Sequence, residues 1–248
     1  MDADGVFYPV VYRSMKTSEK FGNQFIVQIA NEDHLHYAET ICAEMEESAK
    51  KRGTGIAKRS PVYLMEKMVE GKAIIATNTS GDWVGFCYIE TWEHGKFVAN
   101  SGLIVHPDFR QSGIAKAIKA KAFELSRHKY PDAKIIGITT SLAVMKINSD
   151  LGYVPVTFSE LPVEEGFWKG CASCVNYDIL TRTNRKNCLC TGMMYVPPGK
   201  KEEKAKGTWD FLKESALYER LLQIKQKVML RRNEKQNSKK QSETVSVH

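Results

Sequence analysis

The sequence predicts an α+β protein in which helices cover both faces of a mixed, mostly antiparallel sheet. Three observations predict it: short apolar or alternating segments typical of strands, longer segments with apolar residues at helical spacing, and turn residues between them. Their order is strand, two helices, three antiparallel strands, helix, strand, helix and strand. This order favours three layers, α/β/α.

The first half of the chain supplies the first strand and two helices. Residues 1–24 show no clean period, and we interpret them as an N-terminal extension. Phe25–Ile29 predicts a short strand. A helix over about 34–51 follows, which the glycines of 53–55 end, and a second helix begins with Pro61 in its first turn.

Three consecutive strands follow these helices. Segments 72–77 and 83–92 are apolar and are separated by the turn 78–81, which predicts a hairpin. The turn 93–96 leads into a third strand that ends at Val105. Consecutive strands with short turns pair with each other in antiparallel fashion.

A tight turn then joins this strand to a helix. The apolar run 103–105 stops at Pro107, the chain turns through Gly113, and apolar residues recur at helical spacing from Ile114. The first N–H groups of such a helix have no internal partners, and Gly113 lets a ligand approach the backbone. The turn therefore either binds an anion, most often a phosphate, or is an ordinary connection.

The remaining elements complete the domain, which we place at 25–199. A buried strand is predicted over 134–140, a short helix over 142–150 and a further strand over 152–156. Beyond them, two strands over 175–180 and 189–195 predict a cysteine-containing C-terminal hairpin.

The segment Arg110-Gln-Ser-Gly-Ile-Ala115 resembles the acyl-CoA pyrophosphate loop of the GNAT superfamily of N-acyltransferases, written Gln/Arg-x-x-Gly-x-Gly/Ala. The resemblance covers about residues 25–160, with the family's order of elements. It implies that acetyl-CoA, or another short acyl-CoA, is the cosubstrate. Loop N–H groups would hold the pyrophosphate, and the pantetheine arm would pair with the strand edge. The implied coenzyme-binding residues are Leu103, Ile104, Val105, Arg110, Gln111, Ser112, Gly113, Ile114 and Ala115.

Acylation of an amine needs an uncharged nitrogen, a positioned thioester and a donor to the developing oxyanion. A backbone N–H of the strand 103–105 is the expected donor. Glu90 is the first candidate for the base, because it ends the strand beside the coenzyme strand and can act through a water. The plain alternative is a solvated glutamate. His94, His106 and Glu93, all in turns, are further candidates for the base.

One position departs from the family pattern. The family often carries a Tyr four residues before the glycine that matches Gly152, and this Tyr is proposed to reprotonate the leaving thiolate. Asn148 occupies that position here and cannot act as an acid. We therefore assign no general acid.

Cations between the two first helices are candidates for binding the acceptor. Arg52, Lys58 and Arg59 are either solvated loop charges or ligands for a carboxylate, which arginine can hold through two parallel hydrogen bonds. The segments 52–59, 97–105 and 144–148 resemble the corresponding segments of stand-alone N-acetylglutamate synthase-like enzymes of arginine biosynthesis. This implies acetyl, or perhaps succinyl, transfer to a small acidic amino acid such as glutamate.

Two other functions stay open. Acylation of a protein lysine or amino terminus predicts an acidic groove for a basic peptide. The second is a non-enzymatic regulatory module that binds coenzyme or is stabilised by zinc, and the missing Tyr at the Asn148 position gives it some support.

Four of the six cysteines, namely Cys171, Cys174, Cys188 and Cys190, have spacings that could hold zinc. The predicted hairpin would put Cys174 and Cys188 near opposite ends, so we prefer no metal. Cys42 and Cys87 are expected in the core.

Charge and composition exclude some classes of protein. The net charge is +7, but residues 200–248 hold 13 of the 36 Lys and Arg and 7 of the 29 Asp and Glu, so the first 199 residues carry only +1. This argues against a nucleic-acid surface on the domain. No apolar run approaches the length of a membrane span, and the start is acidic, so we expect a cytoplasmic protein without membrane attachment.

The C-terminal region has its own pattern. Residues 200–230 predict an amphipathic helix with apolar residues on two faces, which could pack on the domain and mediate a homodimer. Residues 231–248 are basic, polar and free of aromatic residues, so we expect disorder.

Overall fold

A computed structural model describes residues 18–22, 24–53 and 58–199, apart from the side chain of Arg52. Chain contacts divide the protein into two units, 1–198 and 199–248. The predicted helix and the predicted disordered tail of the second unit lie outside the described residues. The homodimer that the helix could mediate therefore stays a prediction.

The described strands form one eight-stranded sheet with the order β1-β2-β3-β4-β5-β6-β8-β7. Neighbouring strands are antiparallel, except that β5 and β6 are parallel. The strands are β1 (Ser18–Phe21), β2 (Phe25–Ile29), β3 (Ala73–Asn78), β4 (Trp83–Trp92), β5 (Phe97–Val105), β6 (Lys134–Thr139), β7 (Val154–Val156) and β8 (Thr191–Tyr195).

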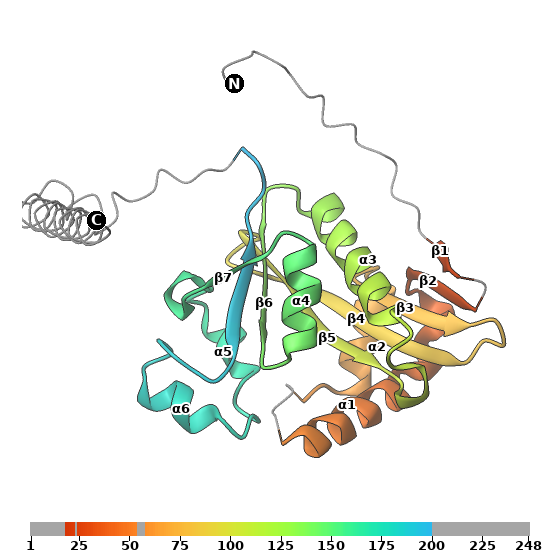
Figure 1. Ribbon diagram of the computed structural model, residues 1–248, viewed down its shortest axis with the longest axis horizontal. Coiled ribbons are helices and arrows are strands. Elements are labelled where there is room, and N and C mark those ends of the chain that lie inside the picture. The colour runs from red at the N-terminus through yellow and green to blue at the C-terminus, as the bar shows by residue number, and fades with distance from the viewer. Residues whose placement is uncertain (1–17, 23, 54–57, 200–248) are drawn as a thin grey trace, which may run out of the picture. The chain divides into compact units, whose positions relative to one another are not determined.

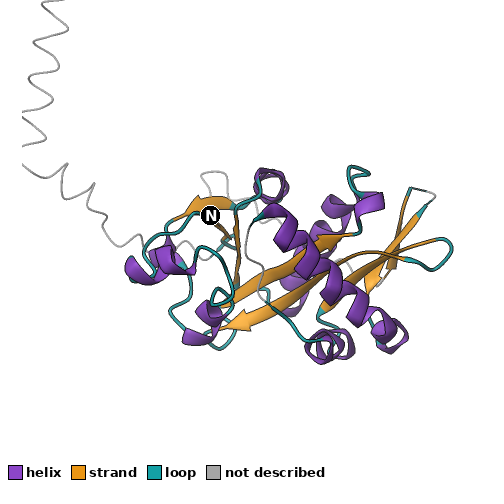
Figure 2. Cartoon of the chain, turned by 90° about the horizontal axis from the view of Figure 1, so that it is seen from below, coloured by secondary structure: helices purple, strands orange, loops and turns teal. Residues whose placement is uncertain are grey.

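Helices cover both faces of this sheet (Figures 1 and 2). The α-helices are α1 (Ala38–Arg52), α2 (Pro61–Val69), α3 (Ile114–Lys129), α4 (Leu142–Asp150), α5 (Glu165–Lys169) and α6 (Tyr177–Arg182). Short 3-10 turns occupy Glu32–Tyr37, Pro107–Phe109 and Phe158–Glu160. None of the described helices is long and apolar enough to cross a membrane.

Because successive side chains of a strand point to opposite faces of the sheet, their core contacts show which face each helix covers. In β3, Ile74 packs in the core with α3, whereas Ile75 packs in the core with α1 and α2. In β8, Met194 packs with Trp168 of α5 and Leu180 of α6. The predicted three-layer α+β fold with a mixed, mostly antiparallel sheet is confirmed.

Local chemistry explains where the helices begin and end. Ser60 Oγ accepts a hydrogen bond from the Tyr63 N–H at 3.2 Å, and Pro61 occupies the first turn of α2. Gly53, in the left-handed conformation, ends α1. The predicted helix from residue 34 begins instead as the 3-10 turn and becomes α-helical at Ala38.

The predicted boundary at residue 25 is one strand too late. Ser18–Phe21 forms β1 and pairs with β2, so part of the predicted extension belongs to the sheet. Because Ser18, Glu19 and Lys20 are polar and β1 is exposed along its whole length, no apolar alternation marks it in the sequence.

The predicted C-terminal hairpin is wrong. Residues 175–180 were expected as a strand because Val175, Tyr177 and Ile179 alternate with polar residues, but Tyr177–Arg182 forms α6. Val175 and Tyr177 are exposed, and Leu180 is the deeply buried residue of this helix. The second predicted strand exists as β8, and it pairs with β6 and β7.

Candidate active site

The site lies where the two parallel strands separate. β5 and β6 pair only over Phe97–Ala99 and Lys134–Ile136, although both strands continue beyond these residues. A cavity of about 670 Å³ is lined by Ala99–Leu103 of β5 and by residues from Gly137 of β6 onward. The edge of β5 from Asn100 to Val105 is therefore unpaired on the β6 side, as the predicted coenzyme strand requires.

β5 carries a bulge beside this cavity. Tyr88 of β4 pairs with Ser101 and Phe86 pairs with Ile104, so Cys87 faces two residues, Gly102 and Leu103. Gly102 has a φ of +63°, and a Cβ there would lie 2.5 Å from the Tyr88 ring. The bulge takes backbone groups out of the ladder, and the sequence signal for it was the glycine inside a strand.

The loop before α3 has the geometry of an anion site. Gly113 is the residue before the helix, with a φ of +83°, and Gln111 also has positive φ. Gly113 has no side chain with which to cap the first N–H groups of this 16-residue helix. Ser112 Oγ accepts from the Ile114 N–H at 3.4 Å and donates to the Phe109 carbonyl at 2.7 Å, which holds the loop.

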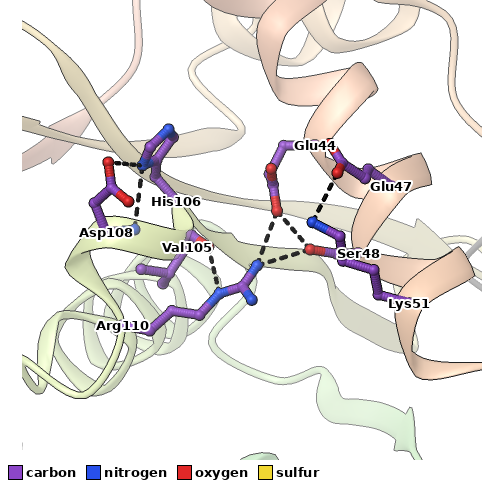
Figure 3. Close-up of polar contacts among 8 residues, drawn as sticks. All are labelled: Glu44, Glu47, Ser48, Lys51, Val105, His106, Asp108 and Arg110. Atoms are coloured by element: carbon purple, nitrogen blue, oxygen red, sulfur yellow. Dashed lines mark hydrogen bonds and ion pairs between the residues drawn. The ribbon is translucent and has the colours of Figure 1, made fainter.

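Arg110 braces the loop instead of facing it (Figure 3). Its Nε donates to the carbonyl of Val105 at 3.2 Å, and its Nη2 donates to Glu44 Oε1 and Ser48 Oγ of α1, each at 2.8 Å. The guanidinium thus ties the end of β5 to α1. Of the implied coenzyme-binding residues, Arg110 contributes its position in the loop, and its side chain is engaged elsewhere.

Glu90 lies in the cavity and has two partners. The Tyr63 hydroxyl donates to Glu90 Oε1, and Arg59 Nη2 lies 3.5 Å from Glu90 Oε2. Arg59 Nε also donates to the Tyr88 hydroxyl at 2.7 Å. Burial, followed by the hydrogen bond to Glu90, raises the pKa of Tyr63 well above its ordinary value, so the phenol stays protonated. The structure brings together the predicted base and one predicted acceptor ligand.

The other two predicted acceptor ligands differ from Arg59. Lys58 lines the cavity, but its side chain is mostly exposed and its Nζ lies 3.7 Å from Glu46 Oε1. The side chain of Arg52 lies outside the described residues.

Among the four candidate bases, Glu90 lines this cavity and the other three do not. Glu93 Oε1 instead accepts from the Val163 N–H at 2.7 Å, and His94 lies with it beside a separate cavity. His106 Nδ1 accepts from the Asp108 N–H at 3.4 Å.

Sequence reasoning missed Lys119. It is 2% exposed, lines the cavity, and its Nζ donates to the Asn100 carbonyl at 3.4 Å. Burial lowers its pKa to about 8, and Cys87 opposes that shift. Because α3 carries four lysines, Lys116, Lys119, Lys121 and Lys129, the sequence alone does not single this one out.

The four cysteines beyond residue 170 lie closer together than the predicted hairpin implied. The Asn176 N–H donates to Cys174 Sγ at 3.4 Å, and Cys188 Sγ lies 4.0 Å from the Asn176 carbonyl. Burial, followed by Cys188 and Cys174, raises the pKa of Cys190 to about 12. Across residues 18–22, 24–53 and 58–199, no group of three or more His, Cys, Asp or Glu is arranged to hold a metal ion.

Comparison with known proteins gives one family match. Residues 42–145 match the family model described as the acetyltransferase (GNAT) family. This span runs from within α1 to the first residues of α4, and it therefore includes the loop, the bulge and Glu90. A comparison with curated proteins found no match.

Among solved structures, the chain is similar to N-acetylglutamate synthase from Neisseria gonorrhoeae complexed with coenzyme A and N-acetyl-glutamate, with a TM-score of 0.50 at 15% identity. The match covers 72% of this chain and 35% of the synthase, so this chain spans about a third of that protein's length. At this identity, the similarity is one of fold.

Two further similar structures cover most of their own chains. One is a Mycobacterium tuberculosis protein in complex with CoA and NLQ, with a TM-score of 0.49, 15% identity, and coverage of 68% of this chain and 98% of that one. The other is phosphinothricin acetyltransferase from Sinorhizobium meliloti in complex with AcCoA, with a TM-score of 0.48, 14% identity, and coverage of 75% and 91%.

Proposed function

We propose that this chain, whose residues 42–145 match the acetyltransferase (GNAT) family model, transfers an acetyl or succinyl group from coenzyme A to the amine of a small acidic amino acid. Glutamate is the acceptor that we expect. The product would then be an N-acylglutamate, and the protein would act in arginine biosynthesis in the cytoplasm. The observation that carries the acceptor class is the charge of the cavity.

Four cations and one carboxylate are the charged side chains of the described residues that line the cavity. They are Lys58, Arg59, Lys119, Lys169 and Glu90. Such a surface attracts an anionic acceptor and repels a basic one. It therefore supports an acidic amino acid over a lysine-rich peptide.

Arg59 is the residue that we propose to bind an acceptor carboxylate. Its side chain is 19% exposed, and three of its N–H donors have partners: the Tyr88 hydroxyl, the Lys58 carbonyl and Glu90. A guanidinium has five donors in a planar fork, so two can still meet a carboxylate. Tyr88 and Glu90 fix the direction of the fork before the acceptor arrives.

Glu90 is the base of the proposed reaction. An acceptor amine arrives protonated and must lose a proton before it can attack a thioester. The Tyr63 hydroxyl donates to Glu90 Oε1 and Arg59 Nη2 lies 3.5 Å from Glu90 Oε2, so both hold the carboxylate in place in the cavity. A backbone N–H released by the bulge at Gly102 and Leu103 would steady the oxyanion.

Chromatographic detection of free CoA tests this proposal. It is preferred to a thiol reagent, because such a reagent would also react with the protein's own thiols. Acetyl-CoA and succinyl-CoA would each be incubated with glutamate, aspartate, lysine, and a lysine-rich peptide. We expect release with the acidic amino acids. Release with only the peptide, or with no amine, would overturn the acceptor class.

Replacement of Arg59 tests its role. In Arg59→Ala, we expect the acceptor KM to rise about tenfold or more, with the Kd for CoA unchanged, because a charged hydrogen-bonded contact contributes about 1.5–3 kcal/mol. Arg182→Ala is the matched control: Arg182 is 69% exposed and pairs with Asp178 on α6. An unchanged acceptor KM in Arg59→Ala would remove Arg59 from the acceptor site.

A further inference from the structure

Lys119 carries a buried ammonium group whose charge has few stabilising contacts. Its only hydrogen bond among the described residues is the 3.4 Å contact with the Asn100 carbonyl, and its Nζ lies 5.5 Å from the centre of the Tyr153 ring. No carboxylate of the described residues lies within ion-pair distance of it. A buried charge without a partner carboxylate is costly, and such groups concentrate at functional sites.

Lys119 lies where strands β5 and β6 stop pairing. Asn100, whose carbonyl it contacts, is the first β5 residue after the last β5–β6 pair, Ala99 with Ile136. The unpaired edge of β5 runs from there to Val105, just before the loop of Gly113. A coenzyme with its pyrophosphate at that loop and its arm along this edge would bring its thioester towards Asn100 and Lys119.

Asn148 supplies a second, independent sign of a ligand at this end of the cavity. It is 1% exposed and lines the cavity, and its Oδ1 is buried with no hydrogen-bond partner. Its Nδ2 has only the Met193 sulfur, at 3.6 Å. An unpaired buried acceptor and a buried ammonium with one long hydrogen bond line the same cavity, and together they fit a ligand that both donates and accepts a hydrogen bond, as a thiol formed from a thiolate does.

We propose that Lys119 gives a proton to the sulfur of coenzyme A as the thioester breaks, and that Asn148 positions that sulfur. This inference rests on the proposed acyl transfer, and it assigns the general acid that the sequence left without a candidate.

The step balances as follows. The acceptor nitrogen attacks the thioester carbonyl carbon, a C–N bond forms, and the C–S bond breaks with its electron pair on sulfur. One Nζ proton of Lys119 moves to the sulfur, which leaves as a thiol, while Lys119 becomes a neutral amine. Glu90 passes the first proton of the acceptor ammonium to solvent before the attack and takes the second proton from the nitrogen as the C–N bond forms. Both side chains then exchange protons with solvent.

The titration of Lys119 suits this transfer. Its pKa of about 8 lies close to that of an ordinary thiol, about 8.5, and proton transfer is efficient between groups of similar pKa. The titratable groups that face it are Cys87 from β4 and Tyr153 before β7. Burial raises the pKa of Cys87 to about 11 and that of Tyr153 well above its ordinary value, so neither changes charge near pH 8.

Lys119→Met and Lys119→Arg test the proposal together, assayed with any amine that gives CoA release. Methionine removes the proton, and arginine keeps the charge but does not release a proton in this pH range. We expect kcat to fall about 10²- to 10⁴-fold in both variants. We also expect the Kd for CoA by calorimetry to stay within threefold, and the fall of wild-type kcat above pH 8 to disappear. Full kcat in Lys119→Arg would show that only the charge matters and would overturn the proposal.

Lys121→Met is the matched control. Lys121 is also buried on α3, but it pairs with Glu19 at 3.4 Å and Glu124 at 2.9 Å and does not line the cavity. We expect its kcat to match the wild type. A loss in Lys121→Met equal to that in Lys119→Met would assign both effects to the helix and would overturn the proposal.

A binding experiment without turnover gives a second readout. Absorbance of the CoA thiolate in the bound state measures the pH at which the sulfur ionises. We expect ionisation at lower pH in wild type than in Lys119→Met, by about one pH unit, because a nearby ammonium stabilises the thiolate. Identical titrations would show that Lys119 is remote from the sulfur. If the wild type neither binds CoA nor releases it with any amine, the proposed function itself fails, and the role of Lys119 fails with it.

Discussion

Gly113→Ala isolates the contribution of the loop before α3 to coenzyme binding. Gly113 has a φ of +83°, and an added Cβ would lie 3.5 Å from the Phe21 ring, an ordinary contact. The cost therefore comes from the backbone: about 1–2 kcal/mol for alanine in the left-handed region, offset by about 0.4–1 kcal/mol from a stiffer unfolded chain. A net loss of about 1 kcal/mol should lower Tm by about 2–4 °C.

The effect on coenzyme binding should be larger. A backbone N–H that meets a charged phosphate contributes about 1.5–3 kcal/mol, so turning one such group away raises the Kd for CoA about tenfold to a hundredfold. Calorimetry on folded protein measures this change.

Gly81→Ala is the control, because Gly81 has a φ of +88° with open space around it in the turn between β3 and β4. It should show the same loss of Tm with unchanged CoA affinity. Equal Kd values in the two variants would refute the assignment of this loop to the pyrophosphate.

Two further predictions concern the bulge and the cysteines. Gly102→Ala should lower the free energy of unfolding in urea by about 2–5 kcal/mol, because of left-handed strain and overlap with Tyr88. The control Gly137→Ala, whose Cβ would be 3.6 Å from Asn148, should lower it by less than about 1 kcal/mol, and similar values for both variants would contradict the bulge geometry. Because burial raises the pKa of Cys190 to about 12, this thiol should be alkylated at pH 8 on the order of a thousandfold more slowly in chelator-treated native protein than in unfolded protein. Metal analysis of untreated protein should find no stoichiometric zinc. Fast alkylation of the native protein, or one zinc per chain, would contradict the description of Cys190 as a partly buried, metal-free thiol.

Most of the fold could be predicted from the sequence because its strongest signals are local. Helix boundaries at Ser60 with Pro61 and at Gly53 follow from capping chemistry, and the apolar strands β3 and β4 follow from burial on both faces. The signal failed where the pattern was ambiguous. The alternation over 175–180 is compatible with a strand, and only the burial of Leu180 against α5 selects a helix.

The proposed coenzyme site could be predicted from the sequence because it depends on backbone conformation. Gly113 is recognisable because few residues tolerate its φ of +83°, and the strand 103–105 is recognisable as an apolar run that Pro107 ends. Lys119 was not recognisable, because its significance depends on the separation of β5 and β6, a tertiary feature. The ion pair between Arg59 and Glu90 likewise joins residues 31 positions apart, and no local sequence pattern predicts it.

The three-pair junction between β5 and β6 has a consequence for the whole sheet. Within the described residues, it is the only backbone ladder that joins strands β1–β5 to strands β6–β8. A pantetheine arm on the free edge of β5 would add amide hydrogen bonds beyond Ala99, where the described strands form no β5–β6 pairs. The bound cosubstrate would then take the place of a strand beside β5, so the hydrogen bonding of the sheet would be most complete when the cosubstrate is bound.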